Sequence, residues 1–570
     1  MSDSENTKRS SVAADIAKSA GEATLALNPI VGMAGRDMFK ASATVLRAMT
    51  TQPDKVARQW LDFASEFTNI LTNSSTTEPD PKDRRFADKA WQNNPLNKAL
   101  MQSYLAWQKT VAKTVEEMDL DDREAAQARL VSSIFTDAMA PSNMLWTNPT
   151  ALKTLVDTGG QSAVSGLRNF FDDMTQNGGL PSSVDASKFK VGENLATSPG
   201  HVIFQNEVLE LIHYTANTEK VYPKPFVLVP PQINKYYSVD LAPEKSMIQF
   251  LLSQGIQPYC ISWRNPTADQ RDWTLATYVE ALDEAVEAAM DITKQKSVNM
   301  MGSCSGGITL SAYTAWLAAQ DQSKKINALV LAVCVLNTSA ETDSDFAALV
   351  SPESVMLAKQ ASAARGVLDG QDMAKMFAWM RPNDLIWNYW VNNYLLGNKP
   401  PAFDVLYWNA DTTRLPAGLH ADFLDMIFTN PFMNPKTLSL NGHPVDMTKV
   451  KHDTMIIAGT TDHITQWKAV YETARIFGED TQFILSNSGH LQSLLNPPGN
   501  PKSWYVKGPA KADNPDDWAE TATKQEGSWW IDWGKYLQER SGKQVAAPKS
   551  PGNKKYPSLG PAPGTYIFEE

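Results

Sequence analysis

The most chemically suggestive segment of the 570-residue chain places a cysteine in a tight, glycine-rich turn. Cys304 lies in SVNMMGSCSGGITLSAY, with glycines at 302, 306 and 307, between a strand-like and a helix-like stretch. A chain that reverses sharply from strand to helix needs small neighbours, because a Cβ would clash there. Such a turn also lifts its central side chain above the carboxyl edge of a sheet. The pattern therefore predicts a nucleophile elbow whose nucleophile is a thiol.

Backbone amides beside this turn are candidates for stabilising an oxyanion. The helix expected after Cys304 begins with free N–H groups and a favourable dipole, which makes the amide of Ser305 the first candidate. A second donor is expected from the loop VPPQINKYY after an early strand, where we predict the amide of Ile233, since the two prolines there have no N–H. The plainer alternatives are a buried cysteine beside a glycine turn and an ordinary strand-to-helix turn.

An acid and a base follow the cysteine in the order of one known type of catalytic triad. Asp462 in AGTTDHITQW and His490 in SNSGHLQS each come directly after a predicted strand. The order nucleophile, acid, histidine is typical of α/β-hydrolases and differs from that of other triads. His463 is a competing base, but neighbouring side chains of an extended segment point to opposite sides. We therefore favour His490 as the base and expect His463 to have a structural or supporting role.

A thiol at this position indicates a particular class of reaction. A cysteine becomes a strong nucleophile where an imidazole or a helix start favours the thiolate. Attack on an acyl thioester exchanges one thioester for another at almost equal energy, so the acyl group stays activated for a second acceptor. The residues therefore favour acyl transfer, although a thioesterase, lipase or depolymerase could use the same three groups with water as the acceptor.

Alternating strands and helices provide the scaffold that these residues need. Apolar strands separated by helices indicate a mostly parallel sheet covered by helices on both faces. The predicted fold class is α/β, specifically an α/β-hydrolase fold with an inserted cap or lid and a helical N-terminal region. The strands are expected in PFVLVPP, IQPYCISW, SVNMMGS, INALVLAVCVLN, TMIIAGTTD and QFILSNSGH.

The length of the chain calls for several regions around one main domain. Residues 1–180 have helical periodicity, and 181–340 form the first part of the predicted sheet domain. Residues 341–447 interrupt the alternation with a segment rich in tryptophan, tyrosine and proline, which predicts a cap. Residues 448–570 complete the sheet domain and add a surface tail.

Composition limits the kinds of partner and the cellular compartment that we expect for this chain. A net charge of −11 argues against general nucleic-acid binding. The three cysteines give no disulfide framework, and we find neither a secretory signal nor an apolar run long enough to span a bilayer. We therefore expect a cytoplasmic protein without a transmembrane segment.

Several segments together resemble the polyhydroxyalkanoate synthases, and specifically the class II enzymes that polymerise medium-chain (R)-3-hydroxyacyl groups from coenzyme A thioesters. Gln232 and the segment SWRNPT favour class II. Two departures, Thr465-Gln466 and Asn337, are expected not to touch the triad. The segments that carry the resemblance are DRRFADKAW, PFVLVPPQINKYY, ISWRNPT, GSCSGG, RPNDLIWNYWVNNYLLG, DVLYWNADTTRLP, AGTTDHITQW and GHLQSLLNPPGNPK.

This resemblance implies roles, partners and a location. Cys304 would be the acylated nucleophile, His490 the general base and Asp462 the triad carboxylate. In this family Asp462 is also proposed to help activate the incoming 3-hydroxyl. The substrate would be an (R)-3-hydroxyacyl-CoA and the product a growing polyhydroxyalkanoate chain at the surface of a cytoplasmic granule. Coenzyme A would be part of the substrate and a product, with no other cofactor and no metal. The helical N-terminal region would serve granule association and assembly, and the enzyme would form a homodimer.

The cap supplies further candidates for substrate contact. Trp387, Trp390 and Trp408 would line an apolar pocket or simply pack in the core, and the sequence leaves both possibilities open. Arg414 would meet a coenzyme A phosphate or form an ordinary surface ion pair. A non-catalytic granule-coat protein is a third hypothesis. Side-chain length preference, dimer geometry, polymer exit and one-site or two-site elongation are not determined by the sequence.

Overall fold

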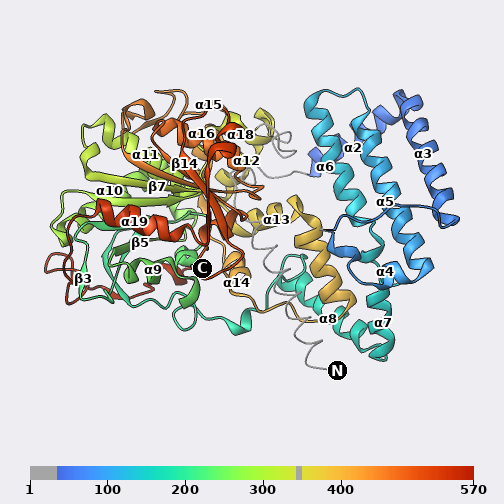
Figure 1. Cartoon of the computed structure of the whole chain (residues 1–570), viewed down its shortest axis with the longest axis horizontal. Coiled ribbons are helices and arrows are strands. Elements are labelled where there is room, and N and C mark those ends of the chain that lie inside the picture. The colour runs from blue at the N-terminus through green and yellow to red at the C-terminus, as the bar shows by residue number, and fades with distance from the viewer. Residues whose placement is uncertain (1–34, 82, 342–349) are drawn as a thin grey trace.

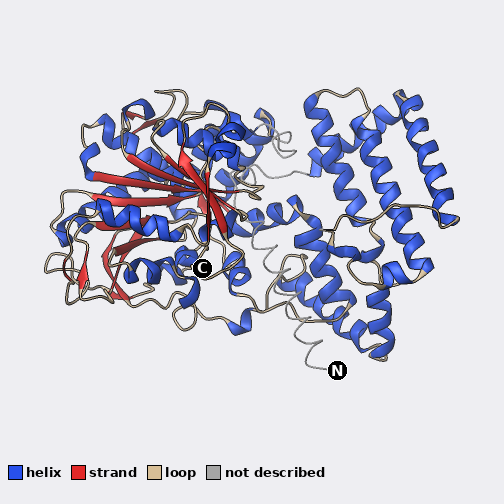
Figure 2. Ribbon diagram, viewed as in Figure 1, coloured by secondary structure: helices blue, strands red, loops and turns tan. Residues whose placement is uncertain are grey.

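The computed structural model describes residues 35–81, 83–341 and 350–570, and places a helical region beside a sheet domain (Figure 1). The start of the predicted helical region, residues 1–34, and part of the predicted cap, 342–349, lie outside the described residues. The sheet domain contains the strands and is covered by helices, whereas the described part of the other region is built from helices (Figure 2).

The helical region owes its sharp helix starts to side chains that cap them. The side chains of Asn94, Asp121 and Asn148 accept hydrogen bonds from the first N–H groups of three helices, where the helix itself offers no acceptor. A small core packs Phe86 and Trp91 against the helix that follows Asn94 and against Ala140. The helices are α2 (Gly35–Thr51), α3 (Pro53–Leu71), α4 (Ala90–Asn93), α5 (Pro95–Glu116), α6 (Asp122–Ala138), α7 (Pro149–Asp157) and α8 (Gln161–Gln176).

Within the described residues, the sheet has eleven strands in the order β15-β14-β13-β12-β7-β6-β4-β5-β2-β1-β17. Its six central strands, from β13 to β5, run parallel, and the strands on either side of them run antiparallel. The strands are β1 (Gly200–Gln205), β2 (Leu209–Tyr214), β4 (Pro225–Val229), β5 (Gln257–Trp263), β6 (Val298–Ser303), β7 (Ile326–Ala332), β12 (Asp453–Gly459), β13 (Gln482–Ser486), β14 (Trp504–Pro509), β15 (Thr523–Glu526) and β17 (Gly560–Pro561).

Helices cover both faces of this sheet, as continuous apolar strands require. Strands β4, β5 and β6 are buried along their whole length, and α11 is buried over its first thirteen residues. The covering helices are α9 (Met247–Ser253), α10 (Leu275–Thr293), α11 (Ser305–Ala319), α16 (Trp467–Phe477), α17 (His490–Leu494), α18 (Pro515–Thr521) and α19 (Trp530–Arg540). The predicted fold class, an α/β-hydrolase sheet preceded by a helical region, is confirmed.

A long insertion between β7 and β12 forms the cap. It contains α12 (Pro352–Arg365), α13 (Gly370–Met380), two π-helical turns, η11 (Asn383–Trp387) and η12 (Trp390–Leu395), then α14 (Asp404–Ala410) and α15 (Ala417–Thr429). In Figure 1, α13 lies between the sheet and the helical region. The indole of Trp390 donates to the carbonyl of Asn143 over 3.0 Å, and the hydroxyl of Tyr394 donates to Asp173 over 2.7 Å. These bonds join the cap to the helical region. The predicted domain boundaries stay a prediction.

Candidate active site

Cys304 sits at the turn between β6 and α11, in the geometry of a nucleophile elbow. Its φ of +49° is a strained conformation for a residue with a Cβ, and the cysteine is only 5% exposed. The turn closes tightly against the end of β4. A Cβ at Gly306 would lie 2.3 Å from the carbonyl oxygen of Val229 and 2.5 Å from that of Pro230. Glycine at 306 is therefore a steric requirement of the elbow.

Asp462 and His490 form a buried pair at the carboxyl ends of the neighbouring strands. His490 Nδ1 lies 2.7 Å from Asp462 Oδ2. The other carboxylate oxygen, Oδ1, accepts the backbone N–H groups of Ile464 at 2.9 Å and Thr465 at 3.0 Å. Both side chains are fully buried. A carboxylate satisfied in this way holds the imidazole in one orientation, which is the role of the acid in a triad.

Cys304 lies near this pair. Its thiol is close enough to the imidazole to help raise the pKa of the ring. Burial alone would lower the pKa of His490, but the charge and hydrogen bond of Asp462, together with the thiol, raise that pKa above its usual range. Burial alone would raise the pKa of Asp462, yet His490 and the hydrogen bonds from Thr465 hold it below its usual value. Asp462 is thus held as a carboxylate, and the more basic imidazole is suited to take up a proton from the thiol.

His463 lies beside the triad without joining it. In the described structure, the imidazole that bonds to Asp462 is that of His490. Burial, followed by the positive charge of Arg381 in the cap, lowers the pKa of His463 to about 4. A ring of low basicity that is not bonded to the carboxylate is badly placed as the base. The geometry therefore favours His490.

The two predicted oxyanion donors lie in segments that touch each other: the loop after β4 and the first turn of α11. The N–H of Gln232 donates to the hydroxyl of Ser305 over 3.3 Å, which brings the loop after β4 against the first turn of α11. The amide of Ser305 opens this helix, where no acceptor of the preceding turn is available to it. Ile233 is buried next to Gln232. The predicted donors therefore share one neighbourhood, although their oxyanion role stays a prediction.

The cap is fastened to this same loop. The hydroxyl of Thr413 donates to the carbonyl of Gln232 over 2.6 Å, and the indole of Trp408 donates to the carbonyl of Lys235 over 2.7 Å. A single strand-like bridge joins Asn234 to Thr412. The position of the cap is thereby coupled to the loop that carries the second oxyanion candidate.

A cavity of about 160 Å³ opens beside the loop after β4. It is lined by the loop, by the cap and by the segment that links the helical region to the sheet. Its apolar wall includes Ile233, Met373, Leu385 and Leu406, and polar groups such as Asn409 interrupt this wall. Such a pocket can hold an aliphatic chain next to the proposed oxyanion loop.

The cap residues predicted to bind substrate have other contacts in this structure. Trp408 is 1% exposed and Trp390 contacts the helical region, so both hold the cap in place. Trp387 packs against Trp390 with ring centroids 5.9 Å apart. The Arg414 guanidinium contacts the carbonyl of Pro266 at 2.7 Å and a main-chain oxygen of Glu570 at 2.6 Å. Contact of these side chains with substrate stays a prediction.

Thr465 was missed as a member of the site. Its hydroxyl donates to Asp462 Oδ2 over 2.7 Å and lies 3.1 Å from His490 Nδ1. The expectation that this departure from the family pattern does not touch the triad is therefore wrong. The signal lay in the three-residue spacing from Asp462, because an Asp at the start of a turn regularly accepts hydrogen bonds from residues two and three positions later.

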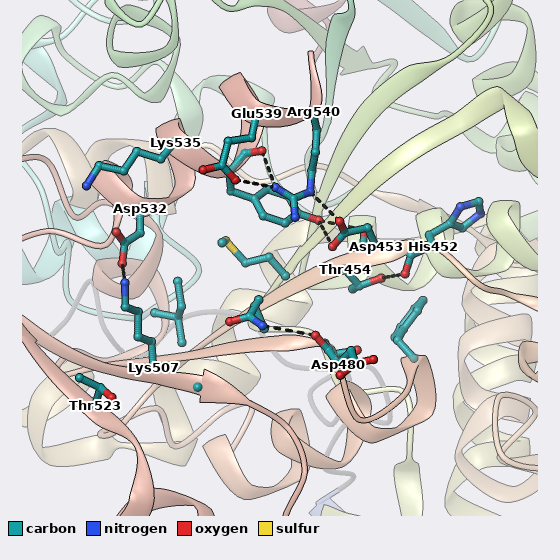
Figure 3. A pocket seen from close by; sticks show the side chains of 17 residues that line it. His452, Asp453, Thr454, Asp480, Lys507, Thr523, Asp532, Lys535, Glu539 and Arg540 are labelled. Carbon is teal, nitrogen blue, oxygen red and sulfur yellow. Dashed lines mark hydrogen bonds and ion pairs between the residues drawn. The ribbon is translucent and has the colours of Figure 1, made fainter. Parts of the chain in front are cut away.

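A larger cavity of about 880 Å³ lies at the opposite end of the strands (Figure 3). It begins at His452 and Asp453, at the amino end of β12, whereas Asp462 follows the carboxyl end of that strand. Its charges are largely paired, with Lys507 on Asp532 at 2.5 Å and Arg540 on Asp453 at 2.7 Å. Size alone therefore does not identify the site of the chemistry.

The described residues contain neither a metal-binding cluster nor a membrane-spanning helix. Within 35–81, 83–341 and 350–570, no group of three or more His, Cys, Asp or Glu side chains is arranged to hold a metal ion. In the same residues, no helix is both long and apolar enough to cross a bilayer.

Comparison with protein families matches two parts of the chain. Residues 82–251 match the family described as "Poly-beta-hydroxybutyrate polymerase (PhaC) N-terminus", and residues 225–497 match the α/β hydrolase fold. A solved monoacylglycerol lipase from Paleococcus ferrophilus is 14% identical with a TM-score of 0.27, covering 46% of this chain and 83% of its own.

Curated relatives match nearly the whole chain. Poly(3-hydroxyalkanoate) polymerases 1 and 2 of Ectopseudomonas oleovorans are 47% and 45% identical, and the matches cover 97% and 95% of this chain and 99% and 96% of theirs. A poly(3-hydroxyalkanoate) polymerase subunit of Cupriavidus necator is 34% identical over 94% of this chain and 91% of its own.

Proposed function

The chain belongs to the poly(3-hydroxyalkanoate) polymerase family, an acyltransferase family, and from that premise we propose that it polymerises (R)-3-hydroxyacyl groups from coenzyme A thioesters through a Cys304 thioester. The observation that carries the proposal is the buried pair of His490 and Asp462 near Cys304, which lies on a nucleophile elbow. A thiol nucleophile keeps the acyl group activated until an alcohol accepts it.

The first half-reaction loads the enzyme. His490 takes the thiol proton at Nε2, and the Cys304 sulfur attacks the thioester carbonyl of the acyl-CoA. The negative charge that develops on the carbonyl oxygen is stabilised by the amides of Ser305 and Ile233. The carbon–sulfur bond to coenzyme A then breaks, and the protonated His490 returns its proton to the leaving thiolate.

The second half-reaction lengthens the polymer. The 3-hydroxyl of one acyl unit loses its proton to the base and attacks the thioester carbonyl of another unit. An oxyester bond forms, the carbon–sulfur bond to Cys304 breaks, and the sulfur recovers a proton. Asp462 keeps the imidazole in the tautomer that this exchange needs, because it accepts from Nδ1 throughout.

Burial of the site supports transfer over hydrolysis. Cys304 is 5% exposed and both partner side chains are fully buried, so water has restricted access to the acyl-enzyme. The cap is fastened to the loop of Gln232 and Ile233, and the apolar cavity beside that loop has the character needed for an aliphatic side chain. We assign the cap a shielding role on this basis.

The same proposal extends to the length of the substrate, the location of the enzyme and the role of its helical region. The chain is more similar to the two E. oleovorans polymerases than to the C. necator subunit, which supports a class II enzyme acting on medium-chain substrates. The growing polymer would place the enzyme at the surface of a cytoplasmic granule. The helical region would contact that granule or a second copy in a homodimer, because it exposes large apolar side chains such as Trp146 at 74% and Val156 at 72%.

Product analysis tests the proposal against a thioesterase, lipase or depolymerase with the same triad. The purified chain and its Cys304→Ala variant are given (R)-3-hydroxydecanoyl-CoA, and coenzyme A release is followed together with solvent-extracted product. We expect coenzyme A and polymer from the parent and neither from the variant. Coenzyme A with only free hydroxy acid would identify a hydrolase instead.

A further inference from the structure

Three cations converge on Glu569 and Glu570, beside the proposed active site. Lys235 Nζ donates to the main-chain oxygen of Glu569 over 2.6 Å, and Arg264 Nε lies 3.1 Å from the Glu569 carboxylate. Arg414 Nη2 donates to the main-chain oxygen of Glu570 over 2.6 Å. The acidic residues thus occupy a basic site that is assembled from distant parts of the chain.

Each cation comes from one of the segments that carry the family resemblance, and none belongs to the triad. Lys235 lies in VPPQINKYY, Arg264 in ISWRNPT at the end of β5, and Arg414 in DVLYWNADTTRLP of the cap. Asn265 links two of these segments, because it accepts from the Arg414 amide over 3.0 Å and donates to the Glu569 carbonyl over 3.2 Å. The convergence of three such segments indicates a built site.

Burial makes this site unusual for a surface ion cluster. Lys235 is only 5% exposed, and its amine faces Asp411 in addition to the two glutamates. Asp411 accepts from the hydroxyl of Tyr237 over 2.8 Å, so it is already engaged. A buried ammonium needs an anion or several acceptors as partners. When the glutamates leave, three cations would face one carboxylate, and the site would accept another anion.

The site is close enough to serve the same substrate as the triad. Lys235 is three residues from Gln232, which touches Ser305, so at most about 11 Å of extended backbone separates them. The indole of Trp408, a cap residue, donates a hydrogen bond to the Lys235 carbonyl and so links this loop to the cap. An acyl-CoA carries its thioester at one end of a flexible arm and its phosphates at the other, so the phosphate site must lie near Cys304 but apart from it.

We propose that Lys235, Arg264 and Arg414 bind the phosphate groups of the acyl-CoA, and that Glu569 and Glu570 occupy this site until substrate displaces them. The identity of the ligand rests on the proposed function. Guanidinium groups suit phosphate because their planar N–H pairs match its oxygens. Displacement needs only a short movement, since the preceding Tyr566 and Ile567 are buried and Thr565 is bonded to Glu210.

Binding without turnover tests this proposal. The parent for the measurement is the Cys304→Ala protein, titrated calorimetrically with coenzyme A and with adenosine 3′,5′-bisphosphate. We expect Arg414→Gln to weaken the binding of both ligands about tenfold or more, as the loss of a charged hydrogen bond requires. Replacing Glu569 and Glu570 together by glutamine should tighten binding about two- to fivefold, because the competing, partly exposed ion pair of Glu569 with Arg264 is removed.

A matched control separates a specific contact from a general change in charge. Arg365→Gln removes a cap cation that pairs with Asp372 at the surface and lies outside the cluster, so it should leave binding unchanged. Thermal unfolding of every variant checks folding, and the double glutamine variant keeps the test valid if Arg414→Gln is destabilised.

Two results would overturn the phosphate site. One is a folded Arg414→Gln variant that binds coenzyme A as tightly as the parent, and the other is a double glutamine variant with unchanged affinity. These outcomes are independent of the product formed by the active enzyme. Release of free acid in place of polymer would refute the proposed function and leave the binding pattern intact.

Discussion

Thr465 offers the sharpest test of how the triad is held together. Its hydroxyl donates to Asp462 Oδ2 over 2.7 Å, and its backbone N–H donates to Oδ1 over 3.0 Å. Thr465→Val removes only the hydroxyl, since valine has nearly the same shape and keeps the N–H. The contact between Asp462 and His490 at 2.7 Å should survive. The variant therefore isolates one hydrogen bond to a buried carboxylate.

The expected loss follows from the strength of that bond. A hydrogen bond to a charged group contributes about 1.5–3 kcal/mol. If this contribution is lost in full from the transition state, kcat falls about 10- to 100-fold. The bond also helps to lower the pKa of Asp462, so its loss raises that pKa. Because the ionised form of Asp462 is the active one and disappears as pH falls, the acidic limb of the rate profile should move to higher pH.

Steady-state release of coenzyme A from (R)-3-hydroxydecanoyl-CoA, measured across a pH series, gives both quantities. Thr465→Ser keeps the hydroxyl and serves as the matched control, which should retain kcat and the acidic limb of the parent within a few-fold. The reasoning is refuted if Thr465→Val has the rate and pH profile of the parent. It is equally refuted if Thr465→Ser loses as much activity as Thr465→Val.

Three further substitutions test other parts of the site. His490→Gln should abolish coenzyme A release, whereas His463→Gln should keep it within a few-fold, because His490 is the imidazole of the two that bonds to Asp462. The reverse order in the same assay would assign the base to His463. Gly306→Ala places a Cβ 2.3 Å from a backbone oxygen and should destabilise the fold by about 1–3 kcal/mol, measured by denaturant unfolding; an unchanged midpoint would contradict the steric requirement. Trp408→Phe removes the indole bond to Lys235 and should lower stability by about 1 kcal/mol; an unchanged unfolding midpoint would show that this bond does not hold the cap.

The sheet and the order of its triad residues were predictable because both depend on local patterns. Apolar strands that alternate with helices specify a parallel sheet, and the turn around Cys304 is specified by the glycines that its geometry needs. The positions of Asp462 and His490 follow from the same rule, since each comes after a strand that ends at one edge of the sheet. The spacing therefore indicated Asp462 and His490, which the fold brings into hydrogen-bond contact, whereas their action with Cys304 as a triad stays a prediction.

Contacts between distant segments were not predictable from these patterns. The bond from Thr413 to Gln232 joins residues 181 positions apart, and the contact of Arg414 with Glu570 joins residues 156 positions apart. Neither pair has a periodicity or motif that relates one member to the other. Thr465 differs, because its three-residue distance from Asp462 is a local signal of their contact. The contacts of Thr413 and Arg414 depend instead on where the cap packs in the folded chain.

The central claim, that Cys304 carries the acyl group, is tested most directly by trapping the acyl-enzyme. Decanoyl-CoA lacks the 3-hydroxyl and can load the enzyme but cannot extend the chain. After acid quenching, mass spectrometry of the intact protein and of its peptides should show one decanoyl group, located on Cys304 and absent from Cys304→Ala. A decanoyl group on another residue, or equal labelling of Cys304→Ala, would contradict the assignment of the nucleophile.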